Sequence, residues 1–361
     1  MNDGGDFLFV DALQHLVEAL DTEANLNSAG RATTNSALMS SLAAQVSARR
    51  NVERHPEIGS LAIRGPVFII GLPGTDGATL HNLLAQHPGV HAPRLWELLT
   101  PAGPRDPQHR MQAIRAAQVF IDDWYGRGRP LPGQRLVGAL LPAECHKLLV
   151  NTFQSMVFVL RYHVPSYVRW LRRRNMTPAY RYHRFLLQSI RWRMPDGLLV
   201  LNCPFHIWSL AALARVYPDA LFVHLHRNPA AVIPSICGLC AALRGVSSDS
   251  VDRRAIGADW LRHVARALAG MEDARRHLVD GRRIIDVRHR DLVEDPLATA
   301  GRICDFIGLP MTISAIERMR GYLAANPPDW PGVDVHTVED FGLSSARIDE
   351  RFAAYRRTFD L

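Results

Sequence analysis

The sequence predicts an α/β protein with a central parallel sheet flanked by helices. Short apolar runs at 67–70, 198–201, 221–225 and 284–287 have strand character, and helical segments alternate with them. Strands that alternate with helices form parallel sheets covered on both faces. The first run passes into a glycine-rich turn, 71–77, before the next helix, which is a strand-to-helix junction suited to binding phosphate.

The chain before the first strand is expected to be helical. Apolar residues recur there at helical spacing, at Leu13, Leu16, Val17 and Leu20 and again at Leu38, Leu42 and Val46. A chain of 361 residues with 47% apolar content can bury one large core. We therefore expect one domain spanning 1–361, with N-terminal helices over 1–60 packed on the core.

The turn after the first strand is a candidate phosphate cradle. Backbone N–H groups converge at such a turn, and the helix dipole adds about half a positive charge. A Walker A loop needs Gly-Lys followed by Ser or Thr, whereas Gly77 is followed by Ala78 and Thr79. The glycine spacing does not fit the dinucleotide-binding fingerprint either. The turn therefore predicts anion binding and argues against a kinase or an ATPase.

A helical insertion is expected over 105–195, between the first helix and the second strand. It is basic, with no Asp or Glu between Arg161 and Pro195. Its arginines are Arg161, Arg169, Arg172, Arg173, Arg174, Arg181, Arg184, Arg191 and Arg193. Such a run is most often a solvated face, but it also fits a small anionic substrate or an acidic carrier protein. Nucleic acid is less favoured, because the order of elements matches no nucleic-acid module.

Cysteine usage and the N-terminus indicate the compartment. Five cysteines without a paired framework favour a reducing environment, and the Cys237–Cys240 pair is expected to pack inside a helix. No metal site is predicted, because zinc would need further ligands at recognisable spacing. Neither a signal peptide nor a run of eighteen apolar residues occurs, so we expect a cytoplasmic protein without a membrane partner. The preference for arginine over lysine indicates a GC-rich bacterial genome.

Three segments together carry a resemblance to a known family. The loop 71–84 aligns without gaps with Gly-Leu-Pro-Arg-Thr-Gly-Thr-Thr-Leu-Leu-His-Asn-Leu-Leu. The strand 221–225 is followed by Arg227-Asn-Pro and, eight positions after the arginine, by Ser235. The strand 198–201 is followed by Asn202-Cys-Pro-Phe-His206. These segments resemble the bacterial branch of the PAPS-dependent sulfotransferases, which implies a P-loop-like sulfotransferase fold in which the insertion helps to shape the acceptor pocket.

The resemblance implies a nucleotide site. Arg227 and Ser235 would bind the 3'-phosphate of PAPS or of its product PAP, because a guanidinium offers two donors and a hydroxyl adds another. The alternative is an arginine that caps a helix or forms an ion pair, beside a serine that only packs. The loop residues implied to hold the 5'-phosphosulfate are Gly74, Thr75, Gly77, Ala78 and Thr79.

Three residues are candidates for acid and base work. His206 would accept the proton of an acceptor hydroxyl, because an imidazole titrates near working pH. The alternative is a histidine that packs at the junction of strand and helix. Asp76 and Glu97 are the other candidates, although Asp76 could instead turn outward or cap the next helix. The sequence leaves open whether Glu97 and Glu144 face the pocket.

The departures from the family pattern gather at the sulfuryl end. The family arginine falls on Gly74, its lysine on Asn202 and a glycine on Asp76. Two like charges about 4 Å apart repel by about 4 kcal/mol at an effective dielectric near 20, so a carboxylate there opposes an anionic donor. Lys147 is the only lysine in the chain, so any replacement cation would otherwise be an arginine from another segment.

Two functions therefore compete. The first is a sulfotransferase that moves a sulfuryl group from PAPS to a hydroxyl or amine of a small molecule in specialised biosynthesis. The second is a PAPS-independent relative that uses Asp76, His206 and Glu97 for cyclisation, elimination or hydrolysis, or a protein that only binds a ligand. In both, the substrate is a small molecule, free or bound to a carrier protein. The sequence does not fix the acceptor or the oligomeric state.

Overall fold

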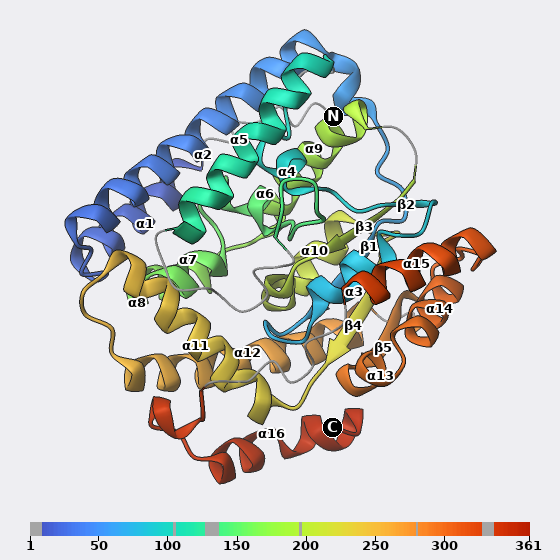
Figure 1. The fold of residues 1–361 in the computed structure, drawn as a ribbon. Coiled ribbons are helices and arrows are strands. Elements are labelled where there is room, and N and C mark those ends of the chain that lie inside the picture. Colours follow the sequence, from blue (N-terminus) through green and yellow to red (C-terminus); the bar gives the residue numbers. More distant parts are fainter. Residues whose placement is uncertain (1–8, 104–105, 127–136, 195–196, 279–280, 327–335) are drawn as a thin grey trace.

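A computed structural model describes residues 9–103, 106–126, 137–194, 197–278, 281–326 and 336–361. Its centre is a five-stranded, entirely parallel sheet with the strand order β2-β3-β1-β4-β5 (Figure 1). The strands are β1 (Val67–Gly71), β2 (Val90–His91), β3 (Leu198–Asn202), β4 (Leu221–His226) and β5 (Ile284–Arg288). The four predicted strands are confirmed, and each extends one residue further toward the carboxyl edge. The two-residue β2 was missed because it is too short to show alternation.

The strands are apolar on both faces because helices cover both. Phe68 and Ile70 of β1 point into the larger core, whereas Val67 and Ile69 point into a second core on the opposite face. The alternation follows from the two-residue period of a strand. Buried side chains thus fix the register of β1, and Val67 pairs with positions in both β3 and β4.

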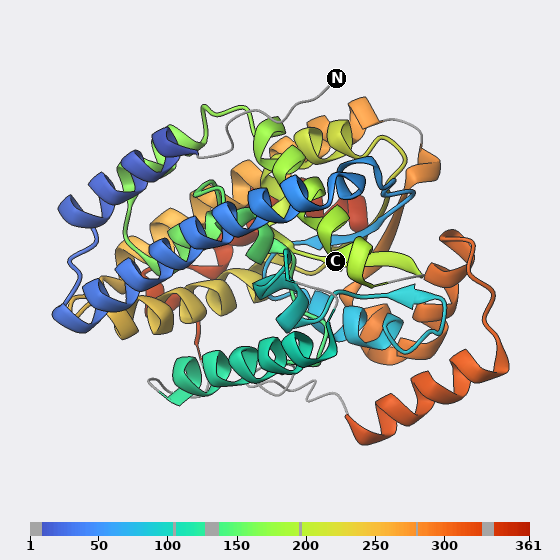
Figure 2. The same ribbon diagram turned by 90° about the horizontal axis from the view of Figure 1, so that it is seen from above.

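Helices make up the rest of the fold. The N-terminal helices are α1 (Val10–Thr22) and α2 (Ser28–Arg54), drawn in blue in Figures 1 and 2, and both lie at the upper left of Figure 1. Helix α4 (Leu95–Leu99) precedes the expected insertion, whose helices are α5 (Pro107–Gly126), α6 (His146–Val150), α7 (Met156–Arg161), α8 (Pro165–Leu171) and α9 (Thr177–Arg193). Those that follow strands are α3 (Gly77–Leu84), α10 (Leu210–Val216), α11 (Pro229–Ser247), α12 (Arg253–Leu278), α13 (His289–Glu294), α14 (Pro296–Phe306), α15 (Ile313–Ala325) and α16 (Ser345–Phe359). The 3-10 turns are η1 (Pro56–Ser60), η3 (Pro204–Ser209), η4 (Gly281–Arg283) and η5 (Glu339–Phe341). Helix α1 packs against α8, and α2 packs against η1 and α11.

Three arginines of the insertion have partners in separate segments. Arg174 pairs with Asp11 of α1, and Arg172 donates to His263 of α12. Arg193 instead donates to the backbone carbonyls of Thr100 and Pro101. These three arginines thus have partners in different segments, whereas Arg169, Arg173 and Arg174 line one surface pocket beside α1.

Helix α11 is the one described helix long and apolar enough to cross a bilayer by length and composition. More than half of its apolar window is buried, and it packs against α2, α7, α12 and α16. These contacts are those of a core helix. Cys237 and Cys240 are both buried on it, as expected for packing residues.

Candidate active site

The candidate site lies where the carboxyl ends of the strands meet. A hydrogen bond within the loop between β1 and α3 stabilises it, because the Thr75 hydroxyl donates to the carbonyl of Leu72 at 2.8 Å. Gly74 has a φ of +87°, a value that favours glycine. The loop then enters α3, so the N–H groups of the residues that begin this helix, Gly77, Ala78 and Thr79, lie at an anion-favouring helix start.

Arg227 and Ser235 both reach this loop at Gly74. Arg227 follows β4, and its Nη1 donates to the Gly74 carbonyl at 2.6 Å. Ser235 comes from the second turn of α11, and a Cβ added at Gly74 would stand 3.3 Å from its hydroxyl oxygen. Two residues predicted to act together are thus brought to one corner, beside the N-termini of two helices. This corner fits a phosphate group.

The sulfuryl end of the cradle is built differently. The side chain of Asn202, at the end of β3, is buried, and a Cβ added at Gly77 would stand 2.7 Å from its Oδ1. Asn202 therefore takes up the space beside the helix start. Neither Gly74 nor Asn202 supplies a positive charge. These two positions therefore do not fit a sulfuryl group, whereas the corner formed by Arg227 and Ser235 fits a phosphate.

Asp76 forms an ion pair that the sequence did not reveal. It precedes α3 in the left-handed region, with a φ of +61° and no side-chain capping bond. Its Oδ2 instead pairs with Nε2 of His289, the first residue of α13 after β5. The alternative in which Asp76 caps the helix does not hold, because its side chain is directed to the residue that follows β5, two strands away in the sheet. The position of His289, directly after a strand of a parallel sheet, was the available signal.

His206 lies in η3, after β3, and is fully buried. Its Nδ1 is 3.0 Å from the hydroxyl of Tyr180, and its Nε2 is 3.1 Å from Sγ of Cys145. Burial lowers the pKa of His206 well below its usual value, and the positive charges that His183 and His146 can carry lower it further. Both ring nitrogens are thus engaged inside the core. The structure does not bring this histidine together with Asp76 at the cradle surface.

The other two acidic candidates have local partners. Glu97 is fully buried in α4, where its Oε2 accepts from the N–H of Arg94 at 2.8 Å and lies 3.2 Å from Nε2 of His91. That first bond belongs to a capping box at the start of α4. Glu144 lies 2.9 Å from Nδ1 of His146. The hydrogen bonds of both carboxylates therefore lie within their own segments, although Oε1 of Glu97 is buried and has no hydrogen-bond partner among the described residues.

Lys147 lies closer to the cradle than its position in the sequence suggests. It belongs to α6, which begins next to the end of β3, because the N–H of Cys145 donates to the Asn202 carbonyl at 2.9 Å. Burial lowers the pKa of Lys147 to about 8, and the neighbouring Arg161 contributes. Two cations that repel each other thus lie half-buried on α6 and α7.

A charged network closes the β4–β5 side of the same edge. Asp286 of β5 accepts two bonds from Arg275, at 2.6 and 2.8 Å, and lies 2.8 Å from Nε2 of His226. The Nδ1 of His226 is 2.7 Å from the hydroxyl of Tyr355 on α16. A cavity of about 770 Å³ opens here, between α12, α16 and the ends of these strands. Sequence reasoning missed this network because its members are far apart along the chain.

A parallel sheet whose β1 loop and post-β4 arginine form a candidate phosphate corner has the architecture of a P-loop-like fold. The chain belongs to the sulfotransferase family, whose model matches residues 66–313. This membership places the chain in a family of transferases. The expectations of family, of transferase class and of a P-loop-like sulfotransferase fold are confirmed.

Mycobacterial proteins are among the most similar relatives. The omega-hydroxy-beta-dihydromenaquinone-9 sulfotransferase Stf3 of Mycobacterium bovis is 25% identical over 278 residues, which cover 72% of this chain and 66% of that protein. The crystal structure of sulfotransferase STF1 from Mycobacterium tuberculosis is 29% identical, with a TM-score of 0.85 and coverage of 98% of this chain and 94% of that one. That of STF9 from Mycobacterium avium is 23% identical, with a TM-score of 0.89 and coverage of 99% and 92%, and shows the common fold.

Proposed function

We propose that this protein transfers a sulfuryl group from PAPS to a hydroxyl or amine of a small molecule in bacterial biosynthesis in the cytoplasm. Family membership supports sulfuryl transfer, and the activity for which the relative Stf3 is named supports a small-molecule hydroxyl as acceptor. The acceptor is either free or bound to a carrier protein. PAPS, when bound, supplies the sulfuryl group.

The convergence of Arg227 and Ser235 on Gly74 is the observation that carries this proposal. We propose that these two side chains bind the 3'-phosphate, because charge-assisted hydrogen bonds to phosphate are strong and directional. Thr75 keeps the loop closed over Leu72, and the N–H groups at the start of α3 bind the 5' end.

The acceptor must lose a proton, and the Asp76–His289 pair is the candidate that remains partly exposed at the loop. An imidazole next to a carboxylate can hold and release a proton near neutral pH. His206 and Glu97 are enclosed, so either can act on an acceptor only if its surroundings open. We therefore assign proton transfer to the pair.

The second candidate is PAPS-independent acid and base chemistry on a biosynthetic intermediate. The specific observation in its favour is that a carboxylate–imidazole pair occupies a cradle without cations at Gly74 and Asn202. Electrostatic stabilisation of developing negative charge is commonly the largest catalytic contribution in group transfer. Without this stabilisation, the protein would keep the nucleotide corner but catalyse a different reaction.

Calorimetric titration of the full chain with PAP and with PAPS separates these candidates. A sulfotransferase binds both in the micromolar range, and Arg227→Ala and Ser235→Ala each weaken PAP binding at least tenfold. The control variant Arg50→Ala, on the exposed surface of α2, leaves binding unchanged. Failure of the parent chain to bind either nucleotide would sink the first proposal.

A gain-of-function variant tests the second candidate. Gly74→Arg, Asp76→Gly and Asn202→Lys together restore the family residues. If the parent is PAPS-independent, PAPS affinity appears only in the triple variant. Rapid sulfate transfer by the parent contradicts the second candidate.

A further inference from the structure

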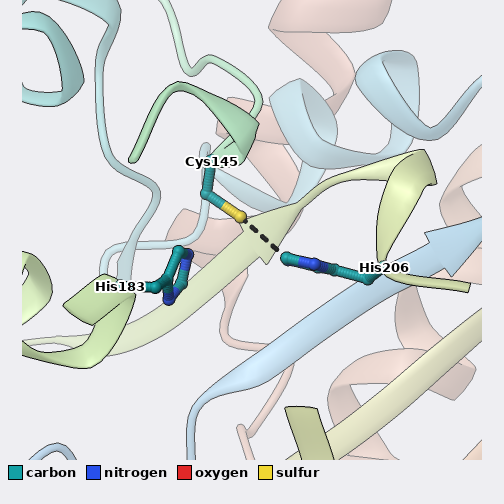
Figure 3. Close-up of side chains that lie close together, drawn as sticks. All are labelled: Cys145, His183 and His206. Carbon is teal, nitrogen blue, oxygen red and sulfur yellow. Dashed lines mark hydrogen bonds between the residues drawn. The ribbon is translucent and has the colours of Figure 1, made fainter. Parts of the chain in front are cut away.

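A second group of polar side chains lies inside the core, away from the exposed cradle. Cys145 immediately precedes α6, His183 belongs to α9 and His206 lies in η3 after β3. One ligand atom from each lies within 4.8 Å of the other two. Figure 3 shows the three side chains directed toward one another. All three are fully buried.

Each imidazole is oriented through the same ring nitrogen. The hydroxyl of Tyr217 lies 2.7 Å from Nδ1 of His183, and that of Tyr180 lies 3.0 Å from Nδ1 of His206. Metal-binding histidines are characteristically fixed in this way by a second bond, which leaves the other nitrogen for the metal. Here the remaining nitrogen is Nε2 in both rings.

Hydrogen bonds account for only part of the group. A thiol proton shared between Cys145 and Nε2 of His206, 3.1 Å apart, satisfies those two residues. Nε2 of His183 is buried and has no hydrogen-bond partner among the described residues. A buried polar atom without a partner is destabilising and needs an explanation. A cation bound by all three side chains supplies one.

We propose that Cys145, His183 and His206 bind a structural zinc ion. Zinc prefers thiolate and imidazole ligands in a tetrahedral arrangement, with Zn–S near 2.3 Å and Zn–N about 2.0–2.1 Å. These lengths require the Cys145 and His206 ligand atoms to separate by only about half an ångström from their present positions. Binding converts the Cys145 thiol to a thiolate and releases its proton.

Cys203 is the candidate for the fourth ligand. It is fully buried, and its thiol interacts with that of Cys145. Cys203 and His206 lie three positions apart, whereas Cys145 and His183 come from distant segments, which is why the sequence alone does not show the site.

A second cluster of possible metal ligands differs from the first, because an arginine already occupies it. His224, His226 and Asp286 also lie within ligand distance of one another. However, Arg275 donates to both oxygens of Asp286, so a guanidinium already neutralises that carboxylate. The described residues place no such cation on the Cys145 group by a hydrogen bond or an ion pair.

The proposed ion would stabilise the cradle indirectly, through Cys145 and Asn202. The N–H of Cys145 donates to the carbonyl of Asn202, and Asn202 packs beside Gly77 at the start of α3. Zinc at this position would fix η3 and the segment before α6 against α9. This inference does not depend on the reaction that the cradle performs.

Metal analysis of the untagged full chain, purified without chelator, tests the proposal. We expect about one zinc per chain and an X-ray absorption spectrum with sulfur near 2.3 Å and nitrogen near 2.0 Å. Cys145→Ala and His183→Ala should each lose the metal, whereas Cys304→Ala, a buried thiol on α14 at the opposite face, should keep it.

The parent chain keeps the test decisive even if both variants fail to fold. Folded parent protein that contains no zinc, and whose Tm does not rise when Zn²⁺ is added, would overturn the proposal. Zinc retained by both folded variants would overturn it as well. A rise in Tm with Zn²⁺ that disappears after Cys145→Ala supports it.

Discussion

The carboxylate of Asp76 and the imidazole of His289 form an ion pair across the phosphate loop, although 213 positions separate them in the chain. Asp76 ends the loop after β1, and His289 begins α13 after β5. The pair gives Asp76 a partner across the site, so its side chain does not cap α3. We therefore expect anion binding at the loop to depend on both residues.

Asp76→Asn should strengthen PAP binding. The substitution removes a negative charge beside the cradle, and asparagine tolerates the left-handed backbone that Asp76 adopts. We expect Kd to fall roughly three- to tenfold at low ionic strength, which corresponds to about 0.7–1.4 kcal/mol, and less at high salt. Calorimetry at two salt concentrations measures this, with Asp21→Asn on α1 as the control. An unchanged Kd at low salt would show that the carboxylate does not oppose the ligand.

Gly77→Ala should destabilise the protein although alanine favours helices. The new Cβ would stand 2.7 Å from Oδ1 of buried Asn202, and overpacking typically costs about 1–3 kcal/mol. Gly270→Ala on α12, where a Cβ meets nothing within 4 Å, should instead stabilise by up to about 1 kcal/mol. Urea unfolding measures both free energies.

The same clash predicts coupling between Gly77 and Asn202. In an Asn202→Ala background the space is open, so Gly77→Ala should become neutral or stabilising. A double-mutant cycle then gives a coupling energy of about 1–2 kcal/mol. Additive effects of the two substitutions would mean that Gly77 and Asn202 are not in the close contact that the structure indicates.

Local features of the site could be predicted from the sequence, whereas its long-range pairs could not. Arg227 and Ser235 lie at the start of one helix, so their shared corner follows from an eight-residue spacing and from the strand before them. Asp76 and His289 meet only because β1 and β5 lie in one sheet, with β4 between them. Pairing of that kind depends on strand order, which periodicity does not encode.

The burial of His206 shows a second limit. Its position after a strand end indicated a functional histidine, and the same position also suits a core histidine. The choice depends on Cys145 and Tyr180, which reach it from the insertion. No pattern in the sequence indicated that these segments enclose its ring. A motif therefore locates a residue along the chain but does not state which way its side chain faces.

Asp286→Asn should loosen the C-terminal helix. Burial raises the pKa of Asp286, but the hydrogen bonds from Arg275 and His226 outweigh it and leave the pKa well below its usual value. Because the carboxylate is partly exposed, we expect a loss of about 1–3 kcal/mol, less than for a fully buried pair. Hydrogen exchange should accelerate over α16, which contacts the network through Tyr355.

Asp349→Asn serves as the control for this network. Asp349 pairs with Arg356 on the more exposed side of the same helix, so its loss should cost less than about 1 kcal/mol. Equal effects of the two substitutions on urea unfolding and on exchange over α16 would refute a special role for Asp286.

His81 should make stability fall as the pH decreases below neutral. It is buried in α3, and its Nε2 lies 2.9 Å from the Val200 carbonyl, so the neutral ring donates there. Burial lowers its pKa to about 4, against about 6.5 in the unfolded chain. Above pH 6.5 both states are neutral at this site. Between pH 6.5 and 4 only the unfolded chain takes up the proton, so stability falls by about 1.4 kcal/mol per pH unit.

His81→Gln should remove this contribution. The glutamine cannot titrate. The free energy of unfolding, measured by urea melts between pH 6.5 and 4.5, should therefore fall less steeply in the variant, and its slope should be smaller than that of the parent by about 1.4 kcal/mol per pH unit. At pH 7.5 the variant should lose about 1 kcal/mol, because the bond to Val200 is altered. His109→Gln, on the exposed surface of α5, should leave the slope unchanged. If the His81→Gln and parent curves run parallel, His81 is not the buried neutral group beneath the phosphate loop that its environment indicates.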